Sequence, residues 1–362
     1  MDSPTRAVID LGALRHNLSV IRERSGQKPL MAIVKANAYG HGALLVSRTL
    51  SKAGVDRFAV ATLPEALELR RGGVKERILV LGMPIGIELE LFERHNLELA
   101  IGSVEILEAL LAGRWRISVH LQVDTGMTRL GISPSDAMGA LRRLSDHPHL
   151  EIAAVFTHFS TADIPGDEQT LDQLARWKLV RSSLPAHLET HASASGGVFT
   201  SPDVARQSDV VRAGIVLYGL YEPGSDVKPE PLRPVMQLIS RIARVQRVEP
   251  GTPVSYGGRW RAPSSGTVIT VAAGYADGLP RRLFGLAHVG IGDNLLPVVG
   301  TICMDMCMAF TDDPEAHFDV GEDVVLWGPG GPSVSELALL ADTIPYEIVC
   351  RVGSRVDRVE RR

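Results

Sequence analysis

Eight short apolar runs alternate with helical patterns along the first 211 residues, and this alternation constrains the fold more than any other feature. Short apolar runs bounded by turn residues are typical of buried strands. The predicted strands are 30–34, 58–61, 78–81, 97–101, 117–123, 152–156, 187–190 and 208–211. Candidate helices between them cover 43–51, 64–71, 103–111, 135–144 and 168–183. Eight strand–helix repeats are the number that closes a (β/α)8 barrel, in which the chemistry lies on the loops after the strands.

The pattern changes at a proline-rich stretch, 223–234, which we interpret as a linker. A short strand over 5–11 and a helix over 14–24 come before the barrel. Strands dominate beyond the linker, at 235–248, 267–273, 296–301 and 323–327, with one late helix at 333–341. The sequence therefore predicts an α/β chain: an N-terminal (β/α)8 TIM barrel over 8–230, then a mainly β C-terminal domain over 231–362, joined by the N-terminal strand 1–7.

Composition excludes several classes of partner. The chain has 362 residues, of which 45% are hydrophobic, enough for one large domain and a smaller one. A net charge of -4 and an aromatic content of 5% argue against a nucleic-acid partner. No apolar run approaches membrane-spanning length, and the N-terminus lacks a signal-peptide pattern. We therefore expect a cytoplasmic protein with no nucleic-acid or membrane partner.

The cysteines indicate a reducing compartment. Cys303, Cys307 and Cys350 form an odd, sparse set without paired spacing, so we expect no disulfide framework. The spacing of Cys303 and Cys307 could suggest a metal site. The intervening Met-Asp-Met and the lack of nearby histidines favour core cysteines instead, and we expect no metal.

Lys35 ends the first apolar run, in the segment LMAIVKANAYGHG over 30–42. A lysine at the edge of an apolar wall is disfavoured as a cation, which makes it useful as an amine. It can form a Schiff base with a carbonyl cofactor or transfer a proton. The ordinary alternative is a solvated lysine at the end of a strand.

The string KANAYGHG resembles the pyridoxal 5'-phosphate (PLP) attachment site of the alanine racemases, and the resemblance extends over nearly the whole chain. It implies that Lys35 forms the Schiff base with PLP and that Tyr39 contacts the phosphate or the Schiff-base side. Racemisation needs proton transfer on both faces of the α-carbon. The resemblance implies that Tyr256, in VSYGG, is the second base and reaches the barrel of a partner subunit, so that a head-to-tail homodimer shares two sites. Tyrosine has a reference pKa of about 10 and needs help to act as a base.

Two loops rich in small residues follow the seventh and eighth strands, HASASGG over 191–197 and RAGI over 212–215. Barrels often bind phosphate there, because small residues let the backbone approach an anion. Taken alone, HASASGG is as readily an ordinary turn with a helix cap. The resemblance implies that Ser195, Gly214 and Ile215 contact the phosphate and that Tyr346 lies near it.

Arg212 resembles the racemase arginine that contacts the pyridine nitrogen of PLP. An aspartate there would hold the ring protonated and make it a strong electron sink, whereas arginine cannot accept that proton. A less delocalised carbanion favours quick reprotonation over elimination or transamination. The resemblance also implies that His158, in FTHF, lies behind Tyr256 and contacts Arg212. A histidine at a strand end is otherwise more often structural.

Substrate recognition needs a cation and backbone donors for the carboxylate. The resemblance assigns Arg129, in DTGMTRLG, to the substrate carboxylate. It also implies that Tyr275 narrows the entrance and that Met304 offers a backbone N–H. Tyr275 and Tyr346 are otherwise as readily ordinary surface or core residues.

Three positions depart from the family pattern. Gln122 stands where many members have a lysine that is carbamylated in some, so we expect no carbamate and an amide that could hold Arg129 by a hydrogen bond. Ala194 replaces a frequent asparagine, which removes one phosphate-side hydrogen bond. Thr301 replaces a frequent arginine and alters the charge at the entrance.

The resemblance implies interconversion of L-alanine and D-alanine by PLP-dependent two-base racemisation, supplying D-alanine for cell-wall peptidoglycan. A broader-specificity racemase, for serine or larger amino acids, is the first alternative, because pocket volume cannot be read from sequence. A barrel-type PLP decarboxylase is disfavoured by the short chain, Arg129 and the Tyr256 motif. A non-catalytic PLP carrier would keep the barrel alone, whereas this chain also has the β domain.

Overall fold

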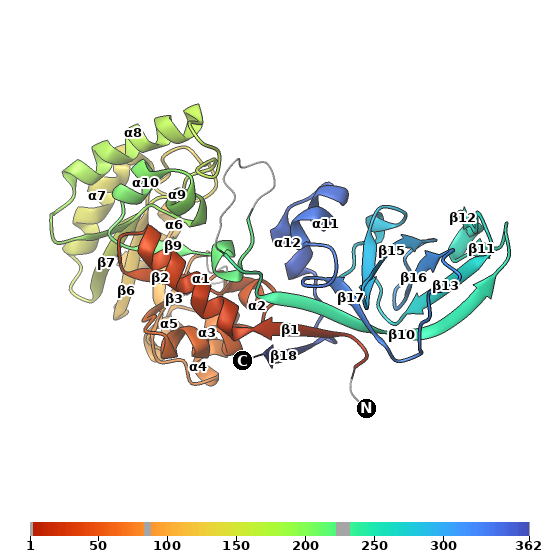
Figure 1. Cartoon of the computed structure of the whole chain (residues 1–362). Coiled ribbons are helices and arrows are strands. Elements are labelled where there is room, and N and C mark those ends of the chain that lie inside the picture. Colours follow the sequence, from red (N-terminus) through yellow and green to blue (C-terminus); the bar gives the residue numbers. More distant parts are fainter. Residues whose placement is uncertain (1–2, 83–87, 222–231, 362) are drawn as a thin grey trace.

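The computed structural model describes residues 3–82, 88–221 and 232–361, which form a barrel and a β domain side by side (Figure 1). The barrel strands are β2 (Leu30–Ile33), β3 (Arg57–Val60), β4 (Arg77–Val80), β5 (Glu98–Ile101), β6 (Ile117–Gln122), β7 (Leu150–Phe156), β8 (Glu189–His191) and β9 (Val211–Ala213). They form one parallel sheet in the order β8-β7-β6-β5-β4-β3-β2-β9. Main-chain hydrogen bonds from Val210 to Thr190 (3.1 Å) and from Arg212 to Ser193 (3.0 Å) join its two edges. The predicted barrel is confirmed.

Helices cover the outside of the barrel. They are α1 (Leu11–Arg24), α3 (Ala43–Lys52), α4 (Leu63–Arg71), α5 (Leu89–Arg94), α6 (Val104–Ala112), α7 (Pro134–Ser145), α8 (Glu168–Ser183), α9 (Ser195–Phe199) and α10 (Pro202–Arg206). Side-chain caps set where many of them begin: the predicted helix over 14–24 starts earlier because the Asp10 carboxylate accepts from the Ala13 N–H. Two short elements, α2 (Lys35–Tyr39) and η1 (Ile215–Tyr218), lie on loops that follow strands.

The C-terminal domain is a small antiparallel barrel, as its mainly β pattern predicted. Its strands are β10 (Met236–Val248), β13 (Gly266–Val271), β14 (His288–Ile291), β15 (Asn294–Val299), β16 (Cys307–Thr311) and β17 (Asp323–Trp327). They follow the order β13-β16-β15-β14-β17-β10, and a pairing of β10 with β13 closes the ring. The short ribbon of β11 (Pro253–Val254) and β12 (Trp260–Arg261) lies at the end of the domain far from the large barrel (Figure 1). The 3-10 turns η2 (Tyr256–Gly258) and η3 (Arg281–Leu283) complete this region.

The N-terminal strand β1 (Arg6–Asp10) belongs to the sheet of the C-terminal domain. It pairs antiparallel with β10 and parallel with β18 (Asp357–Arg361). The two ends of the described chain therefore meet in one sheet.

Several predicted boundaries were wrong in detail. The strands predicted at 187–190 and 208–211 lie two and three residues later, at β8 and β9. The apolar pattern had placed residues 190 and 209 in paired strands. The Thr190 N–H instead donates to the Asp209 carboxylate (2.9 Å), so a side chain takes the place of a strand hydrogen bond there. The predicted domain boundary at 230/231 and most of the linker lie outside the described residues.

The late helix predicted at 333–341 is α11 (Val334–Leu340), and a second helix that was not predicted, α12 (Pro345–Cys350), follows it. Pro345 occupies the first turn of α12, a position that proline favours. Strands β11, β12, β14, β16 and β18 were not predicted. Among the residues that the structure describes, no helix is long and apolar enough to cross a membrane.

The C-terminal segment packs on the loop that follows β2. The Arg358 side chain donates to the Gly40 carbonyl (2.9 Å) and also to the carbonyls of Val352, Gly353 and Val356. A Cβ on Gly40, where φ is +80°, would overlap with the Val349 carbonyl. This contact fixes α12 beside the end of the barrel where the strands terminate.

Candidate active site

A cavity of about 440 Å³ opens at the C-terminal ends of the barrel strands. Nine of the twelve predicted site residues line it: Lys35, Tyr39, Arg129, His158, Ser195, Arg212, Gly214, Ile215 and Tyr346. The other three, Tyr256, Tyr275 and Met304, belong to the C-terminal domain and do not line it. Residues from five barrel strand ends and from α12 thus converge on one space.

The turn after Lys35 is left-handed. Ala36, Asn37, Ala38 and Tyr39 all have φ between 51° and 53°, which makes this one turn of left-handed helix without a glycine. Such a turn costs about 1–2 kcal/mol per residue. Sequence reasoning expected only a strand-to-helix loop here.

Specific hydrogen bonds hold this turn. The Glu65 carboxylate, at the start of α4, accepts from the Ala36 N–H (2.6 Å) as well as from Ala61 and Thr62. The His41 Nδ1 lies 2.8 Å from the Tyr39 carbonyl and 3.0 Å from that of Ala38, so it donates to this pair. The side chain of Lys35 therefore leaves the strand from a fixed backbone.

The electrostatic setting favours a neutral amine on Lys35. Burial lowers the pKa of the Lys35 ammonium, and the positive charge of Arg129 lowers it further, while Glu65 opposes the shift. A lowered pKa increases the fraction of the lysine present as the free amine, which is the form that acts as a nucleophile or accepts a proton.

Tyr39, Ser195 and Gly214 form a small polar cradle in the cavity wall. The Gly214 N–H donates to Ser195 Oγ at 3.0 Å. A Cβ placed on Gly214 would lie 2.9 Å from Tyr39 Oη and 3.5 Å from Ser195 Oγ, so the space requires glycine. The Tyr39 ring packs 5.0 Å from that of Tyr218 and 5.8 Å from that of Tyr346. Hydroxyl groups and a bare backbone thus face the cavity, which suits a phosphate.

Arg212 is buried and held by its terminal nitrogens. Nη2 donates to the Thr157 carbonyl (2.8 Å) and to His158 Nδ1 (3.1 Å), as the predicted Arg212–His158 contact required. Nη1 donates to His191, both to Nδ1 (2.8 Å) and to the carbonyl. None of the hydrogen bonds of Arg212 within the described part of the chain uses Nε. That N–H is the donor available to a ligand in the cavity.

Burial and nearby cations lower the pKa values of two further side chains in the cavity. Burial lowers the pKa of Arg212 to about 9, and Arg129 contributes. Burial, followed by the charges of Arg212, Arg129 and Lys35, lowers the pKa of His158 to about 3. His158 is therefore neutral at physiological pH, and its Nδ1 is a hydrogen-bond acceptor.

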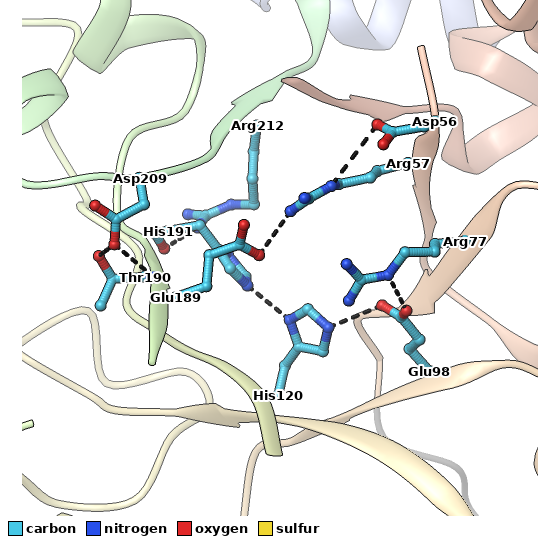
Figure 2. A network of polar contacts seen from close by, with 10 residues as sticks. All are labelled: Asp56, Arg57, Arg77, Glu98, His120, Glu189, Thr190, His191, Asp209 and Arg212. Atoms are coloured by element: carbon cyan, nitrogen blue, oxygen red, sulfur yellow. Dashed lines mark hydrogen bonds and ion pairs between the residues drawn. The ribbon is translucent and has the colours of Figure 1, made fainter. Parts of the chain in front are cut away.

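A line of buried polar side chains continues from Arg212 across the barrel interior (Figure 2). His191 Nε2 lies 2.8 Å from His120 Nδ1, and His120 Nε2 lies 2.8 Å from Glu98 Oε2. Arg77 forms an ion pair with the other oxygen of Glu98. Sequence reasoning gave no role to His191, His120 or Glu98. The available signal was a charged or histidine residue inside an otherwise apolar strand.

Arg129 lies on a loop that an aspartate organises. Asp124 Oδ1 accepts from the main-chain N–H groups of Gly126 (2.9 Å), Met127 (2.9 Å) and Thr128 (3.1 Å). Gln122 Nε2 donates to the Leu130 carbonyl at 3.0 Å, next to Arg129. The hydrogen bond expected between the Gln122 amide group and the Arg129 side chain is therefore replaced by a hydrogen bond to the adjacent main chain.

The three remaining predicted residues are exposed on the C-terminal domain. Tyr256 is 72% exposed, Met304 53% and Tyr275 42%. The Tyr275 N–H donates to the Cys303 carbonyl (3.1 Å), and Thr301 Oγ1 donates to the Tyr256 carbonyl (3.1 Å). The segment 301–304 thus ties the three residues into one exposed cluster.

Comparisons with known proteins agree over the whole chain. The family model described as "Alanine racemase, N-terminal domain" matches residues 9–222, and "Alanine racemase, C-terminal domain" matches 235–360. The chain belongs to the alanine racemase family. An alanine racemase of Chlorobaculum tepidum is 40% identical over 368 residues, which cover 98% of this chain and 95% of that protein.

Solved alanine racemases share the fold. The enzyme of Clostridium difficile 630 superposes with a TM-score of 0.92 at 35% identity, covering 100% of this chain and 96% of that one. A Bartonella henselae alanine racemase with covalently bound pyridoxal phosphate has a TM-score of 0.89 at 29% identity, with 99% of each chain covered.

The residues of this alanine racemase family member fit PLP. The fit rests on the cradle that a Cβ at Gly214 would fill and on the amine of Lys35 in the same cavity. The buried Arg212 supplies an N–H donor that its protein contacts leave unused.

Proposed function

We propose that this chain interconverts L-alanine and D-alanine with PLP as cofactor. The observation that carries the proposal is one cavity lined by the Lys35 amine, the Arg212 guanidinium and the Gly214 cradle. PLP, when bound, withdraws electrons from the amino acid and so acidifies its α-hydrogen.

The chain's own residues have distinct roles in this proposal. Tyr39, Ser195, Gly214, Ile215 and Tyr346 hold the phosphate. Arg212 orients the pyridine nitrogen, and His158 orients Arg212.

Lys35 Nζ holds the cofactor and then exchanges a proton with the α-carbon on the D face. The lowered pKa of Lys35 supports this role, because a neutral amine can accept the proton.

Tyr256 of the partner subunit exchanges the proton on the L face. Tyr256 is exposed and lies in the connection between β11 and β12, the ribbon at the end of the C-terminal domain far from the large barrel (Figure 1), and this supports a head-to-tail homodimer with two shared sites. Tyr275 and Met304 belong to the same exposed cluster and would reach the partner's cavity with it. Arg129 binds the substrate carboxylate, Tyr275 narrows the entrance and Met304 donates its backbone N–H.

We further propose that the enzyme works in the cytoplasm and supplies D-alanine for peptidoglycan. The three cysteines are free, in keeping with a reducing compartment. We also propose that the boundary between the two domains lies at 230/231.

The test is a racemisation assay with a Tyr256→Phe variant. The wild-type holoenzyme should convert either enantiomer of alanine to the racemate, followed by polarimetry. Removal of the hydroxyl should nearly abolish turnover of L-alanine and leave PLP binding unchanged. Full activity of Tyr256→Phe would refute the second-base role. Comparable turnover of serine would favour the broader-specificity alternative.

A further inference from the structure

The polar line behind Arg212 is unusual for the inside of a barrel. Barrel interiors are normally filled by branched apolar side chains. Here Glu98, His120, His191 and Arg212 come from β5, β6, β8 and β9, and each is at most 7% exposed (Figure 2). Burying such groups is unfavourable unless every one of them is hydrogen-bonded.

The chemistry of arginine sets the direction of these hydrogen bonds. A guanidinium has donors only, so His191 Nδ1 must accept from Arg212 Nη1 at 2.8 Å. A neutral His191 then carries its proton on Nε2 and donates to His120 Nδ1 at 2.8 Å. His120 in turn carries its proton on Nε2 and donates to the Glu98 carboxylate at 2.8 Å.

A charged His120 is incompatible with this order. Its Nδ1–H would point at the Nε2–H of His191, which places two donors against each other. Burial, together with the charge of Arg212, lowers the pKa of His191 well below its usual value, with smaller effects of Arg57 and Arg77. Both rings are therefore neutral, and the chain of bonds has one possible polarity.

Resting on the proposed function, we propose that Glu98, His120 and His191 form a directed hydrogen-bond relay that holds Arg212 in place, and keeps it charged, at the pyridine side of the cofactor. Hydrogen bonds in series polarise one another, so the carboxylate at one end strengthens the acceptor that Arg212 meets at the other. These three are positioning residues, since they act through Arg212.

Phe156 completes the arrangement. Its ring stacks on His191 with centroids 4.5 Å apart and an interplanar angle of 14°. The same ring lies 5.4 Å from the guanidinium carbon of Arg212. The apolar contact covers one face of the His191 ring and shields this part of the relay from water.

Arg57 and Glu189 provide a matched comparison. They form a second ion pair inside the same barrel at 2.6 Å, and Figure 2 shows both pairs in one view. No hydrogen bond between described residues connects Glu189 to Arg212. Glu189 is the more exposed of the two carboxylates, with 26% of its side chain accessible against 9% for Glu98, and a purely structural role for barrel ion pairs would give both substitutions an effect.

The first experiment reads the tautomers directly. The PLP-loaded protein is prepared with ¹⁵N-labelled histidine, and ring signals are assigned by their loss in His120→Asn and His191→Asn. We expect a proton on Nε2 and a bare Nδ1 for both rings. An Nδ1–H tautomer or an imidazolium at either residue at neutral pH overturns the relay. This measurement does not depend on turnover, so it stands even if the holoenzyme fails to racemise alanine.

The second experiment compares Glu98→Gln with Glu189→Gln. An amide offers one acceptor oxygen where Glu98 now accepts from both His120 and Arg77, so one donor is left unmatched. We expect Glu98→Gln to shift the visible absorption band of the lysine-bound cofactor and to lower kcat about tenfold with KM within about twofold, as for the loss of one charged hydrogen bond. Glu189→Gln should leave the band and kcat unchanged. Equal effects of the two variants, or no effect of Glu98→Gln, would refute the proposal. Should Glu98→Gln fail to fold, the tautomers decide the question.

Discussion

Replacement of Gly214 by alanine should weaken PLP binding without disturbing the rest of the barrel. The new Cβ would lie 2.9 Å from Tyr39 Oη, closer than real Cβ contacts allow. The Tyr39 ring has little room to retreat, because Tyr218 and Tyr346 pack at 5.0 and 5.8 Å. Overpacking of this kind costs about 1–3 kcal/mol. If the strain displaces the hydroxyl from the phosphate, the Kd for PLP rises roughly 5- to 150-fold.

The assay is a titration of apoenzyme with PLP, followed by visible absorbance. Gly139→Ala is the control, because a Cβ on Gly139 meets nothing within 4 Å in α7. It should leave the Kd unchanged and raise the free energy of unfolding by up to about 1 kcal/mol, through helix propensity. Tyr39→Phe removes both the oxygen that the Cβ meets and its contact with the phosphate, so the double variant should bind PLP about as tightly as Tyr39→Phe alone, and the two losses should not add. A wild-type Kd for Gly214→Ala, or no coupling between the two changes, would refute the reasoning.

Two further predictions test residues outside the cradle. Thr301→Val removes the hydroxyl that donates to the Tyr256 carbonyl, so kcat should fall about fivefold, which corresponds to about 1 kcal/mol, while the Kd for PLP stays constant. Thr301→Ser keeps the hydroxyl and should behave as wild type. A kcat unaffected by Thr301→Val would show that this hydrogen bond does not support Tyr256. Burial raises the pKa of Glu98, but the hydrogen bonds from His120 and Arg77 and the charge of Arg77 outweigh it and hold the pKa at about 2, below the ordinary 4.5. A depressed carboxyl pKa stabilises the fold above pH 4.5, and this stabilisation is lost as the pH falls toward 2. Between these two pH values the unfolding free energy of the wild type should therefore fall by about 3 kcal/mol more than that of Glu98→Gln. Parallel stability curves for wild type and Glu98→Gln would contradict the assignment.

The parts of the site that sequence could predict are those that sit directly after strands. Lys35, His158 and Arg212 each follow or end an apolar run, and parallel strands bring such positions to one end of a barrel. The convergence of these side chains on one cavity follows from topology alone.

The parts that sequence could not predict depend on register. Alternation indicates that His120 points into the barrel, but whether it meets His191, two strands away, depends on the stagger of the strands. The left-handed turn after Lys35 gave no signal either, because its residues, Ala-Asn-Ala-Tyr, contain no glycine. The turn is held by His41, within the same loop, and by the distant Glu65, which also caps α4.

The pairing of β1 with β18 has a consequence for how the chain is made. From Arg6 to Asp357 there are 351 residues, and at roughly 5–20 residues per second a ribosome needs about 20 to 70 seconds to cover that distance. For most of that interval β1 is outside the ribosome while β18, its partner strand, does not yet exist. The large barrel can close during synthesis, but the sheet that unites both ends must wait until translation is almost over.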